Sequence, residues 1–361
     1  MTNSDFPGSE LTSALSEPIS VSWQSPSNIA LVKYWGKTGR QLPVNPSLSM
    51  TLSKAFTETT LTALPRKIQG SVQLDFWFEG NQNAAFGERM NKFLQSVTDI
   101  FPWLAQVNLK LETHNTFPHS AGIASSASAF SALALCLCSL DTELNGIMLD
   151  ETEFRQKASY VARLGSGSAC RSVFPGFTVW GKSKSYLGSS DLLAVPVTEL
   201  HPVFTTLMDT IIIVTDKEKS VSSSEGHNRM IGHPFAEARI KQAEKNTKDL
   251  LEALKTGDKK TFIRIVENEA LTLHALMMTS DEGFMLMYPD TVWIINRIQE
   301  IRKETGLDIC FTLDAGPNVH LLYFKDQFEQ VNKLIVEDLL KNNEQNMRID
   351  DFYGKGPVKV G

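Results

Sequence analysis

Two short segments of the chain combine small residues with donors that could hold an anion. Residues 118–127 read Pro-His-Ser-Ala-Gly-Ile-Ala-Ser-Ser-Ala and lie between a predicted strand and a long apolar helix. Small residues let a backbone approach a ligand closely, and Ser125 and Ser126 lie where the helix begins, so the helix dipole favours an anion there. No lysine follows, as it would in the Gly-x-x-x-x-Gly-Lys loop, and a serine cap on a core helix would use the same residues.

The second segment, residues 165–171, reads Gly-Ser-Gly-Ser-Ala-Cys-Arg and directly follows another predicted helix. Ser166, Ser168 and Arg171 are donors close together in the chain, with no acidic side chain among them. Such a set suits a phosphate or a carboxylate, because a planar guanidinium can hold either group through two bonds. A helix C-cap would explain Gly165, but it explains Arg171 poorly.

Three further segments each have a chemical and a purely structural interpretation. Lys33 stands among apolar and aromatic residues of segment 27–37, either placed for an anion or extended over the aromatics toward solvent. Asp314 follows the apolar run 310–313 and precedes Ala-Gly-Pro-Asn, which suits an ordinary turn or a carboxylate that faces a cleft. Residues 217–226 are typical of a flexible loop, either a linker or a mobile lid that carries lysines.

The elements that must position these residues are predicted from hydrophobic periodicity. Strands and helices are mixed without regular βαβ alternation, which favours an α+β chain in two lobes with a boundary within residues 190–235. We expect a turn at residues 25–27 and a polar, mobile extension over residues 1–19. Strands are predicted at 19–22, 50–63, 71–79, 106–113, 176–180, 211–214, 308–313 and 319–324. Helices are predicted at 86–102, from about 125 to 140, and at 151–164, 235–256, 259–278, 290–304 and 326–341.

Composition excludes several classes of protein. The 361 residues are 42% hydrophobic and 21% charged, an ordinary globular mix, and a net charge of −6 leaves no basic excess for a nucleic-acid backbone or an anionic membrane. The longest nearly apolar run, Phe130 to Leu140, is about half of a membrane span. Residues 1–20 show no signal or transit peptide, and the four cysteines match neither a disulfide framework nor a zinc pattern. We therefore expect a soluble, cytoplasmic protein with no nucleic-acid or membrane partner.

Taken in order along the chain, these motifs resemble one family. Residues 118–127 resemble the phosphate loop of the superfamily that contains galactokinase, homoserine kinase, mevalonate kinase and phosphomevalonate kinase, the GHMP kinases. Within it, the segment Asn28 to Lys37, residues 165–171 and residues 314–318 closely resemble the motifs of the diphosphomevalonate decarboxylases. The resemblance covers roughly residues 20–325, and four motifs in sequence are much more specific than the phosphate loop alone.

The resemblance implies a fold and an assembly. It implies an α+β, two-lobed GHMP-kinase-like fold, with an N-terminal α/β lobe over residues 20–195 that carries the phosphate loop. A C-terminal ferredoxin-like lobe is expected over residues 196–361, with a cleft between the lobes and residues 1–19 as a flexible extension. The resemblance also implies a homodimer.

The resemblance implies a reaction as well: ATP-dependent decarboxylation of 5-diphosphomevalonate to isopentenyl diphosphate, in the mevalonate route to isoprenoids. ATP would phosphorylate the tertiary 3-hydroxyl, because an alcohol is a poor leaving group until it is phosphorylated. Departure of that phosphate would put cationic character on C3, and the C1 carboxylate would then be lost as CO₂. The partners would be small molecules, mevalonate diphosphate and ATP, with Mg²⁺ as the metal ion.

Roles follow by similarity, residue by residue. Asp314 would lie beside the 3-hydroxyl as a base or an orienting acceptor, and Arg171 would hold the C1 carboxylate with the help of Asn28. Together with Lys33, these two charged residues, Asp314 and Arg171, would carry the catalysis. The substrate diphosphate would be bound, and charge near the reacting end balanced, by four side chains: Ser166, Ser168, Tyr34 and Lys33.

The nucleotide site is assigned in the same way. Gly122, Ser125 and Ser126 would cradle the ATP phosphates, and Lys219 would reach the γ-phosphate when its loop closes. A hydroxyl of Ser125 or Ser126 would bind Mg²⁺, which would otherwise rely on ATP oxygens and water. Thr116 and His119 depart from the family's usual Asn-Asn-Phe-Pro-Thr pattern, so the details of this site differ.

Three alternatives stay open at this stage. A decarboxylase that acts on 5-phosphomevalonate would carry the same motifs, since serines and lysines can bind a monophosphate as well as a diphosphate. A 3-kinase that stops before decarboxylation fits less well, because Asp314, Lys33 and Arg171 are all present. A non-catalytic member that binds metabolites would not need Asp314 together with a full phosphate loop.

Overall fold

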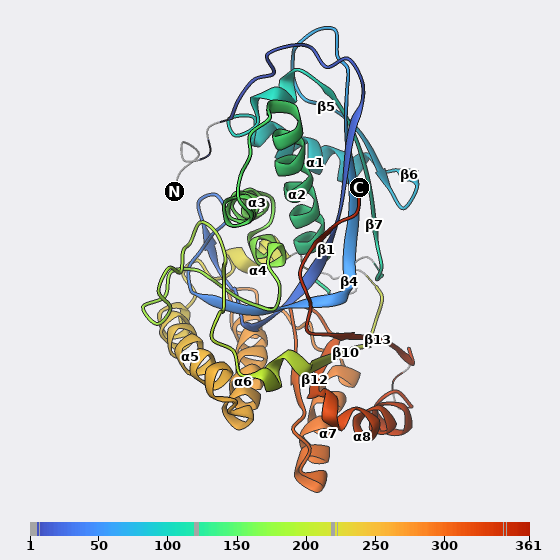
Figure 1. The fold of residues 1–361 in the computed structure, drawn as a ribbon. Coiled ribbons are helices and arrows are strands. Elements are labelled where there is room, and N and C mark those ends of the chain that lie inside the picture. Colours follow the sequence, from blue (N-terminus) through green and yellow to red (C-terminus); the bar gives the residue numbers. More distant parts are fainter. Residues whose placement is uncertain are drawn as a thin grey trace.

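The computed structural model describes residues 6, 8–118, 123–217, 221, 223–341, 343 and 345–361. Two lobes follow one another along the chain, the first drawn in blue to green and the second in gold to red, except that the red C-terminal segment returns to the first lobe (Figure 1). The long strands β1 (Ile19–Val32) and β4 (Ser47–Leu64) belong to the first lobe and extend to the second. The two-lobed α+β prediction is thereby confirmed.

An eight-stranded sheet supports the first lobe. Its main order is β14-β1-β4-β7-β5-β6, while β8 pairs with β4 and with β9. The β5–β7 pair is parallel, and the other pairs are antiparallel. The remaining strands are β5 (Gln73–Phe78), β6 (Asn81–Gln82), β7 (Asn108–Asn115), β8 (Phe177–Trp180), β9 (Val195–Pro196) and β14 (Val358–Lys359), and a separate hairpin joins β2 (Lys37–Thr38) to β3 (Leu42–Pro43).

Helix α2 (Ser125–Asn145) is the central helix of the first lobe. It is long and apolar enough to cross a membrane, but 78% of that stretch is buried inside the protein. A helix that is apolar on all sides is buried, and α2 packs between the sheet strands β1 and β4 and helix α3 (Glu151–Gly165). The shorter helix α1 (Ala84–Ser96) lies against β5, and the 3₁₀ segment η2 (Pro102–Ala105) follows it.

The second lobe contains a four-stranded antiparallel sheet in the order β11-β12-β10-β13. Helices precede β11 and separate β12 from β13, so the chain runs β-α-β-β-α-β, as the predicted ferredoxin-like lobe requires. The strands are β10 (Leu207–Ile213), β11 (Cys310–Thr312), β12 (Val319–Phe324) and β13 (Met347–Phe352). The helices are α4 (Ser223–Asn228), α5 (Ala236–Thr256), α6 (Lys259–Met278), α7 (Pro289–Thr305) and α8 (Phe328–Leu334), with short turns η4 (Pro202–Thr206), η5 (Lys325–Gln327) and η6 (Ile335–Leu339).

The lobes are joined by a shared core. Ile29 of β1 belongs to the same buried apolar cluster as Ile211 of β10 and Ile265 of α6. The carboxylate of Asp351, on β13, accepts backbone N–H bonds from residues 53–55 of β4 at 2.7–2.9 Å. A junction that is packed and hydrogen-bonded in this way holds side chains from both lobes at fixed positions across it.

Two local predictions are wrong. The expected turn at residues 25–27 does not form, because β1 continues through Pro26 with only a register shift against β4. The expected extension is packed in its described part: Leu11 and Leu15 lie against the core of the first lobe, and the Leu11 N–H donates to Gln106 Oε1 at 2.7 Å. Both errors arise because long-range contacts overrode the local signals of proline and polar residues.

Candidate active site

A polar cavity of about 450 Å³ lies between the two lobes. The first lobe lines it with residues of β1, of the turn after β1, of the start of α2 and of the 3₁₀ segment η3 (Gly167–Val173); the second lobe adds residues of α4, of α6 and of the turn after β11. The cavity brings together eight of the predicted site residues that the structure describes: Asn28, Lys33, Tyr34, Ser126, Ser166, Ser168, Arg171 and Asp314. Ser125 does not line it.

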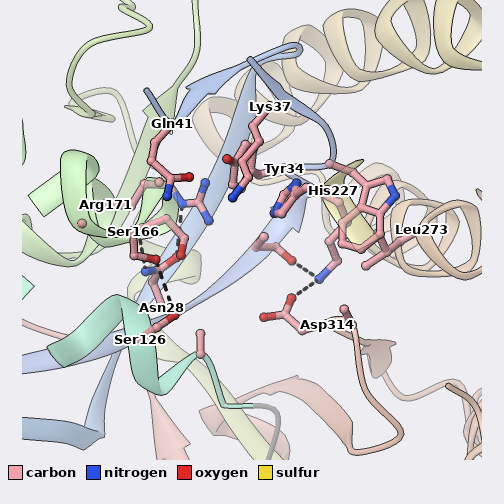
Figure 2. Close-up of a pocket in the computed structure, with 18 of the residues that line it drawn as sticks. Asn28, Tyr34, Lys37, Gln41, Ser126, Ser166, Arg171, His227, Leu273 and Asp314 are labelled. Atoms are coloured by element: carbon pink, nitrogen blue, oxygen red, sulfur yellow. Dashed lines mark hydrogen bonds and ion pairs between the residues drawn. The ribbon is translucent and has the colours of Figure 1, made fainter. Parts of the chain in front are cut away.

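Arg171 is held rigidly on one side of the cavity (Figure 2). Its Nε donates to Asn28 Oδ1 at 3.1 Å, and its Nη1 donates to Ser47 Oγ at 2.7 Å. The amide of Asn28 is itself fixed, since Nδ2 donates to the Ser168 carbonyl and to Ser172 Oγ. Both hydrogens of that amide are therefore engaged, and Asn28 orients Arg171 and leaves the remaining guanidinium N–H groups for a ligand.

Lys33 and Asp314 form an ion pair at the opposite side of the cavity. Lys33 Nζ lies 3.0 Å from Asp314 Oδ1 and also donates to the Ala30 carbonyl at 2.5 Å. The lysine side chain is 2% exposed and the aspartate 24%, so the carboxylate is the accessible member of the pair. Burial lowers the pKa of Lys33, while the charge and hydrogen bond of Asp314 oppose that shift.

The turn after β11 explains how Asp314 reaches this position. Its backbone carbonyl accepts the Gly316 N–H at 2.7 Å, so the expected turn exists. The same carbonyl lies 3.1 Å from His274 Nε2 of α6, and burial lowers the pKa of His274 to about 4, so the ring is neutral and donates from Nε2. The main chain therefore makes the turn while the carboxylate pairs with Lys33, and the structural and chemical interpretations both hold.

The start of α2 lies at the same cavity. Its N-cap is Ala124, whose φ of 48° is in the left-handed region, and no side chain caps the helix. The first N–H groups of a helix left without such a cap are an anion site. Ser126 Oγ lies 3.4 Å from Ser166 Oγ, which joins the two serine motifs (Figure 2).

A second, smaller cavity of about 150 Å³ adjoins α2. Ser125 and Ser126 line it together with aromatic and aliphatic side chains of β5 and α1 and with Phe130. Ser126 thus contributes to both cavities and Ser125 to the apolar one only.

Tyr34 and His227 form an aromatic wall that sequence reasoning only half identified. Their rings lie 4.3 Å apart, and the Tyr34 hydroxyl is buried with no hydrogen-bond partner in the described part of the chain. Burial raises the pKa of Tyr34 and lowers the pKa of His227 to about 3, so both are neutral donors. His227 Nδ1 accepts the Gly36 N–H at 3.0 Å, which puts the ring proton on Nε2.

Other lining residues were missed because nothing local marked them. Lys37 and Arg89 add positive charge to the cavity wall, and burial lowers the pKa of each. Arg89 lies on α1, far in sequence from every motif, and like Lys92 it is an ordinary basic residue of an amphipathic helix. With Lys33 and Arg171, the wall carries four cationic side chains against the carboxylate of Asp314, which suits an anionic substrate.

Two predicted ligands of the nucleotide, Gly122 and Lys219, lie outside the described residues, as does His119. Thr116 is described, and its hydroxyl donates to the Lys54 carbonyl at 2.6 Å and accepts the Phe56 N–H at 3.0 Å. This departure from the family pattern therefore ties the end of β7 to β4.

Comparison with known proteins agrees with this geometry. Residues 25–194 match the family described as "Diphosphomevalonate decarboxylase-like N-terminal domain", and residues 210–356 match the "Mevalonate 5-diphosphate decarboxylase C-terminal domain". The diphosphomevalonate decarboxylase of Ganoderma lucidum is 31% identical over 336 residues, which cover 87% of this chain and 80% of the relative. This chain belongs to the diphosphomevalonate decarboxylase family.

Solved structures of the family share its fold. The mevalonate diphosphate decarboxylase of Staphylococcus aureus superposes with a TM-score of 0.81 at 28% identity, over 97% of this chain and all of the other. A structure of MDDEF in complex with MVAPP, AMPPCP and magnesium superposes with a TM-score of 0.79 at 30% identity, over 95% of this chain and 99% of the other. The predicted family and fold are therefore confirmed.

Proposed function

We propose that this chain catalyses the ATP-dependent decarboxylation of mevalonate diphosphate to isopentenyl diphosphate, with release of ADP, phosphate and CO₂. One observation carries the proposal: in a chain of this family, the Lys33–Asp314 pair and the anchored Arg171 face one cavity that has an excess of positive charge. The related structure that contains MVAPP, AMPPCP and magnesium supports the same substrates.

The chemistry assigns a task to each charged residue. Asp314 accepts the proton of the tertiary 3-hydroxyl as the hydroxyl oxygen bonds to the γ-phosphorus of ATP and ADP leaves. The C3–O bond then breaks with departure of phosphate, and the electron pair of the C1–C2 bond forms the new double bond as CO₂ leaves. Arg171 aligns the C1 carboxylate for that loss, and the Lys33 ammonium balances charge near C3.

Substrate binding falls to the donors around these residues. Ser166, Ser168 and the Tyr34 hydroxyl bind the diphosphate, in a wall where Lys37 and Arg89 supply further positive charge. The unpartnered Tyr34 hydroxyl supports this role, because a buried hydroxyl without a partner is costly unless a ligand satisfies it.

The nucleotide fits the start of α2. The uncapped first turn suits the ATP phosphates, and the aromatic walls of the second cavity suit a flat base. Within the described ranges, no group of three or more His, Cys, Asp or Glu side chains could hold a metal ion. Mg²⁺ would therefore be held by ATP oxygens, water and a hydroxyl of Ser125 or Ser126, and it would neutralise the phosphate charge.

One assay tests the proposal against its alternatives. The protein is mixed with ATP and Mg²⁺ and with mevalonate diphosphate or mevalonate monophosphate, and ADP, phosphate and CO₂ are measured separately. Equal amounts of all three products with the diphosphate alone are expected. Turnover of the monophosphate would favour the alternative substrate, which the names of the relatives do not favour. ADP without CO₂ would indicate a kinase, and no product would indicate a binding protein.

Ser126→Ala should raise the KM for ATP by roughly 2- to 10-fold, as expected for the loss of one hydrogen bond, and should shift the Mg²⁺ dependence. The KM for mevalonate diphosphate should change less. Ser131→Ala is the matched control, since that buried hydroxyl of α2 bonds to Ser25 Oγ at 2.7 Å away from both cavities. An unchanged response of Ser126→Ala to ATP and Mg²⁺, with damage confined to the second substrate, would contradict the assignment.

The pH dependence should report Lys33. Because burial lowers its pKa below the ordinary value of 10.5, activity that needs the ammonium declines on the basic side at a pH below that value. In Lys33→Arg the guanidinium stays charged, so this basic decline should move to higher pH even where kcat is reduced. The profile of kcat/KM against pH provides the measurement, and a decline that does not move would assign it to another group.

We also propose that the chain passes from the first lobe to the second near residues 195 and 196, at β9. We further propose a cytoplasmic location and a homodimeric state for this chain. All four cysteines are free and buried, which supports a reducing compartment. Sedimentation analysis tests the dimer.

A further inference from the structure

Glu269, in the middle of α6, is a fully buried carboxylate that lies outside the cavity lining and is satisfied by four donors. Its side chain is 0% exposed, and its partner Arg239, on α5, is 2% exposed. Arg239 binds it through both Nη atoms, at 2.8 Å to Oε1 and 2.7 Å to Oε2, and Asn246 Nδ2 adds a bond of 2.7 Å to Oε1. The fourth donor is the backbone N–H of Lys33, at 2.8 Å from Oε2.

The same cluster also holds the carbonyl of Lys33. Arg239 Nη2 donates to that oxygen at 2.8 Å, and Asn45 Nδ2 donates to it at 2.9 Å. Lys33 follows directly after the last residue of β1, so its peptide groups have left the strand. Buried backbone groups need partners, and here Glu269 and Arg239 of the second lobe supply them to Lys33 of the first, together with Asn45 of the first lobe.

Helix α6 also holds the other member of the ion pair. His274, five positions after Glu269, donates from Nε2 to the Asp314 carbonyl at 3.1 Å. Five residues of an α-helix advance by about 7.5 Å. One rigid helix therefore binds the main chain of Lys33 at one point and that of Asp314 at another.

We propose that Glu269, together with Arg239, is a positioning pair that fixes the backbone of Lys33 and so keeps its ammonium in contact with Asp314. The inference rests on the proposed function for its kinetic consequence. A buried ion pair is weak evidence for stability, because apolar residues of the same volume often stabilise as well or better. The bonds from this pair to a reacting residue's main chain give it a task that apolar residues could not perform.

The charged groups around Lys33 set the sign of a pH effect. They are Asp314 after β11, Glu269 on α6, Arg239 on α5 and Arg171 on η3. The charges of Asp314 and Glu269 raise the pKa of Lys33, and that of Arg171 lowers it. Neutralising Glu269 removes one raising charge and leaves Arg239 uncompensated, so the pKa of Lys33 falls further.

The same helix offers a matched control. Glu267 makes a bidentate pair with Arg302 of α7, at 2.5 Å and 2.9 Å, and it is not among the residues that line the cavity or surround Lys33. Glu269→Gln and Glu267→Gln therefore each weaken a bidentate pair with an arginine, although the Glu267 pair is the more exposed, and both should lower the melting temperature. Only Glu269→Gln should lower kcat, by about 10²-fold as for a misplaced reacting group, with the KM for ATP changed less than about twofold. The decline of activity on the basic side of the pH profile should occur at a lower pH in Glu269→Gln than in the wild type.

Asn246→Ala keeps the inference testable where Glu269→Gln does not fold, because it removes one donor and leaves the ion pair intact. A smaller loss of kcat with an unchanged KM for ATP is expected. Normal kcat in a folded Glu269→Gln or Asn246→Ala protein, or equal kcat losses in the two glutamate variants, would overturn the positioning role.

A readout without turnover separates this inference from the proposed function. NMR of ¹³C-labelled lysine, assigned with Lys33→Arg, follows the titration of Lys33 directly. The pKa should fall in Glu269→Gln and stay unchanged in Glu267→Gln. An inactive wild-type protein with this titration difference would contradict the proposed function alone, whereas an active wild-type protein with equal titrations in both variants would contradict the positioning pair alone.

Discussion

Asp314→Asn should lower kcat by about 10²- to 10⁴-fold while the fold and the KM for ATP stay close to those of the wild type. A carboxamide cannot take the proton of the 3-hydroxyl, yet it is the same size and can still accept a hydrogen bond from Lys33 Nζ, now 3.0 Å from Oδ1. The backbone contacts of Asp314 with Gly316 and His274 do not involve the side chain, so the turn persists. Steady-state kinetics and thermal melting provide the measurements.

Asp308→Asn is the matched control for Asp314→Asn. Asp308 also flanks β11 and pairs with a lysine, Lys259 Nζ at 3.1 Å, but it lies away from the cavity. Its substitution should leave kcat within about twofold, because a partly exposed ion pair contributes little. Near-normal turnover in a folded Asp314→Asn protein would reduce this aspartate to a former of the turn.

Much of the fold could be predicted from the sequence because its elements are strongly periodic. The amphipathic pattern of α6 predicted residues 259–278, the bounds that the structure has, and the alternation at 71–79 predicted β5 to within two residues. The strands β13 and β14 were missed, since their short and polar sequences are stabilised by pairing with β10 and β1. Pairing partners so far away in the chain leave no local signal.

The residues of the candidate site also differ in whether the local sequence marks them. Asp314 and Arg171 stand out in short motifs, whereas Glu269 and Arg239 are single charged residues within long helices. One signal for Glu269 was present in the sequence. It lies two helical turns after Phe262, on the same buried face of α6, so a charged residue stands where the pattern calls for an apolar one. A charged residue at a core position of an amphipathic helix indicates a partner, but not which one.

Arg171→Lys and Arg171→Gln should both lose activity, although the lysine keeps the charge. Arg171 donates from Nε to Asn28 Oδ1 and from Nη1 to Ser47 Oγ, so its orientation depends on the planar guanidinium that lysine lacks. Loss of one charge-assisted contact costs roughly 1.5–3 kcal/mol, which lowers kcat/KM by about one to two decades. Because the carboxylate must also be aligned for the loss of CO₂, kcat should fall as well.

Arg163→Lys separates a specific role from the general effect of removing a buried arginine. Arg163 is as buried as Arg171 and donates to the carbonyls of Leu192 and Arg40, but it does not line the cavity. The Arg163→Lys protein should be less stable than the wild type and should keep its selectivity for the carboxylate. Thermal melting and kcat/KM of the two lysine variants, measured side by side, make this comparison.

The decisive measurement for Arg171 uses a mevalonate diphosphate analogue in which a neutral amide replaces the carboxylate. The binding of this analogue is compared with that of mevalonate diphosphate in a competition experiment. Wild type and Arg163→Lys should discriminate strongly against the amide, because Arg171 presents N–H donors and a positive charge, and an amide returns neither the charge nor the second acceptor oxygen. Arg171→Gln should discriminate much less, since its neutral side-chain N–H groups can donate to an oxygen of either ligand and carry no charge that favours the carboxylate. Equal discrimination by wild type and Arg171→Gln would mean that Arg171 does not touch the carboxylate. The recognition of C1 would then fall to Lys33, the other buried cation in the cavity wall.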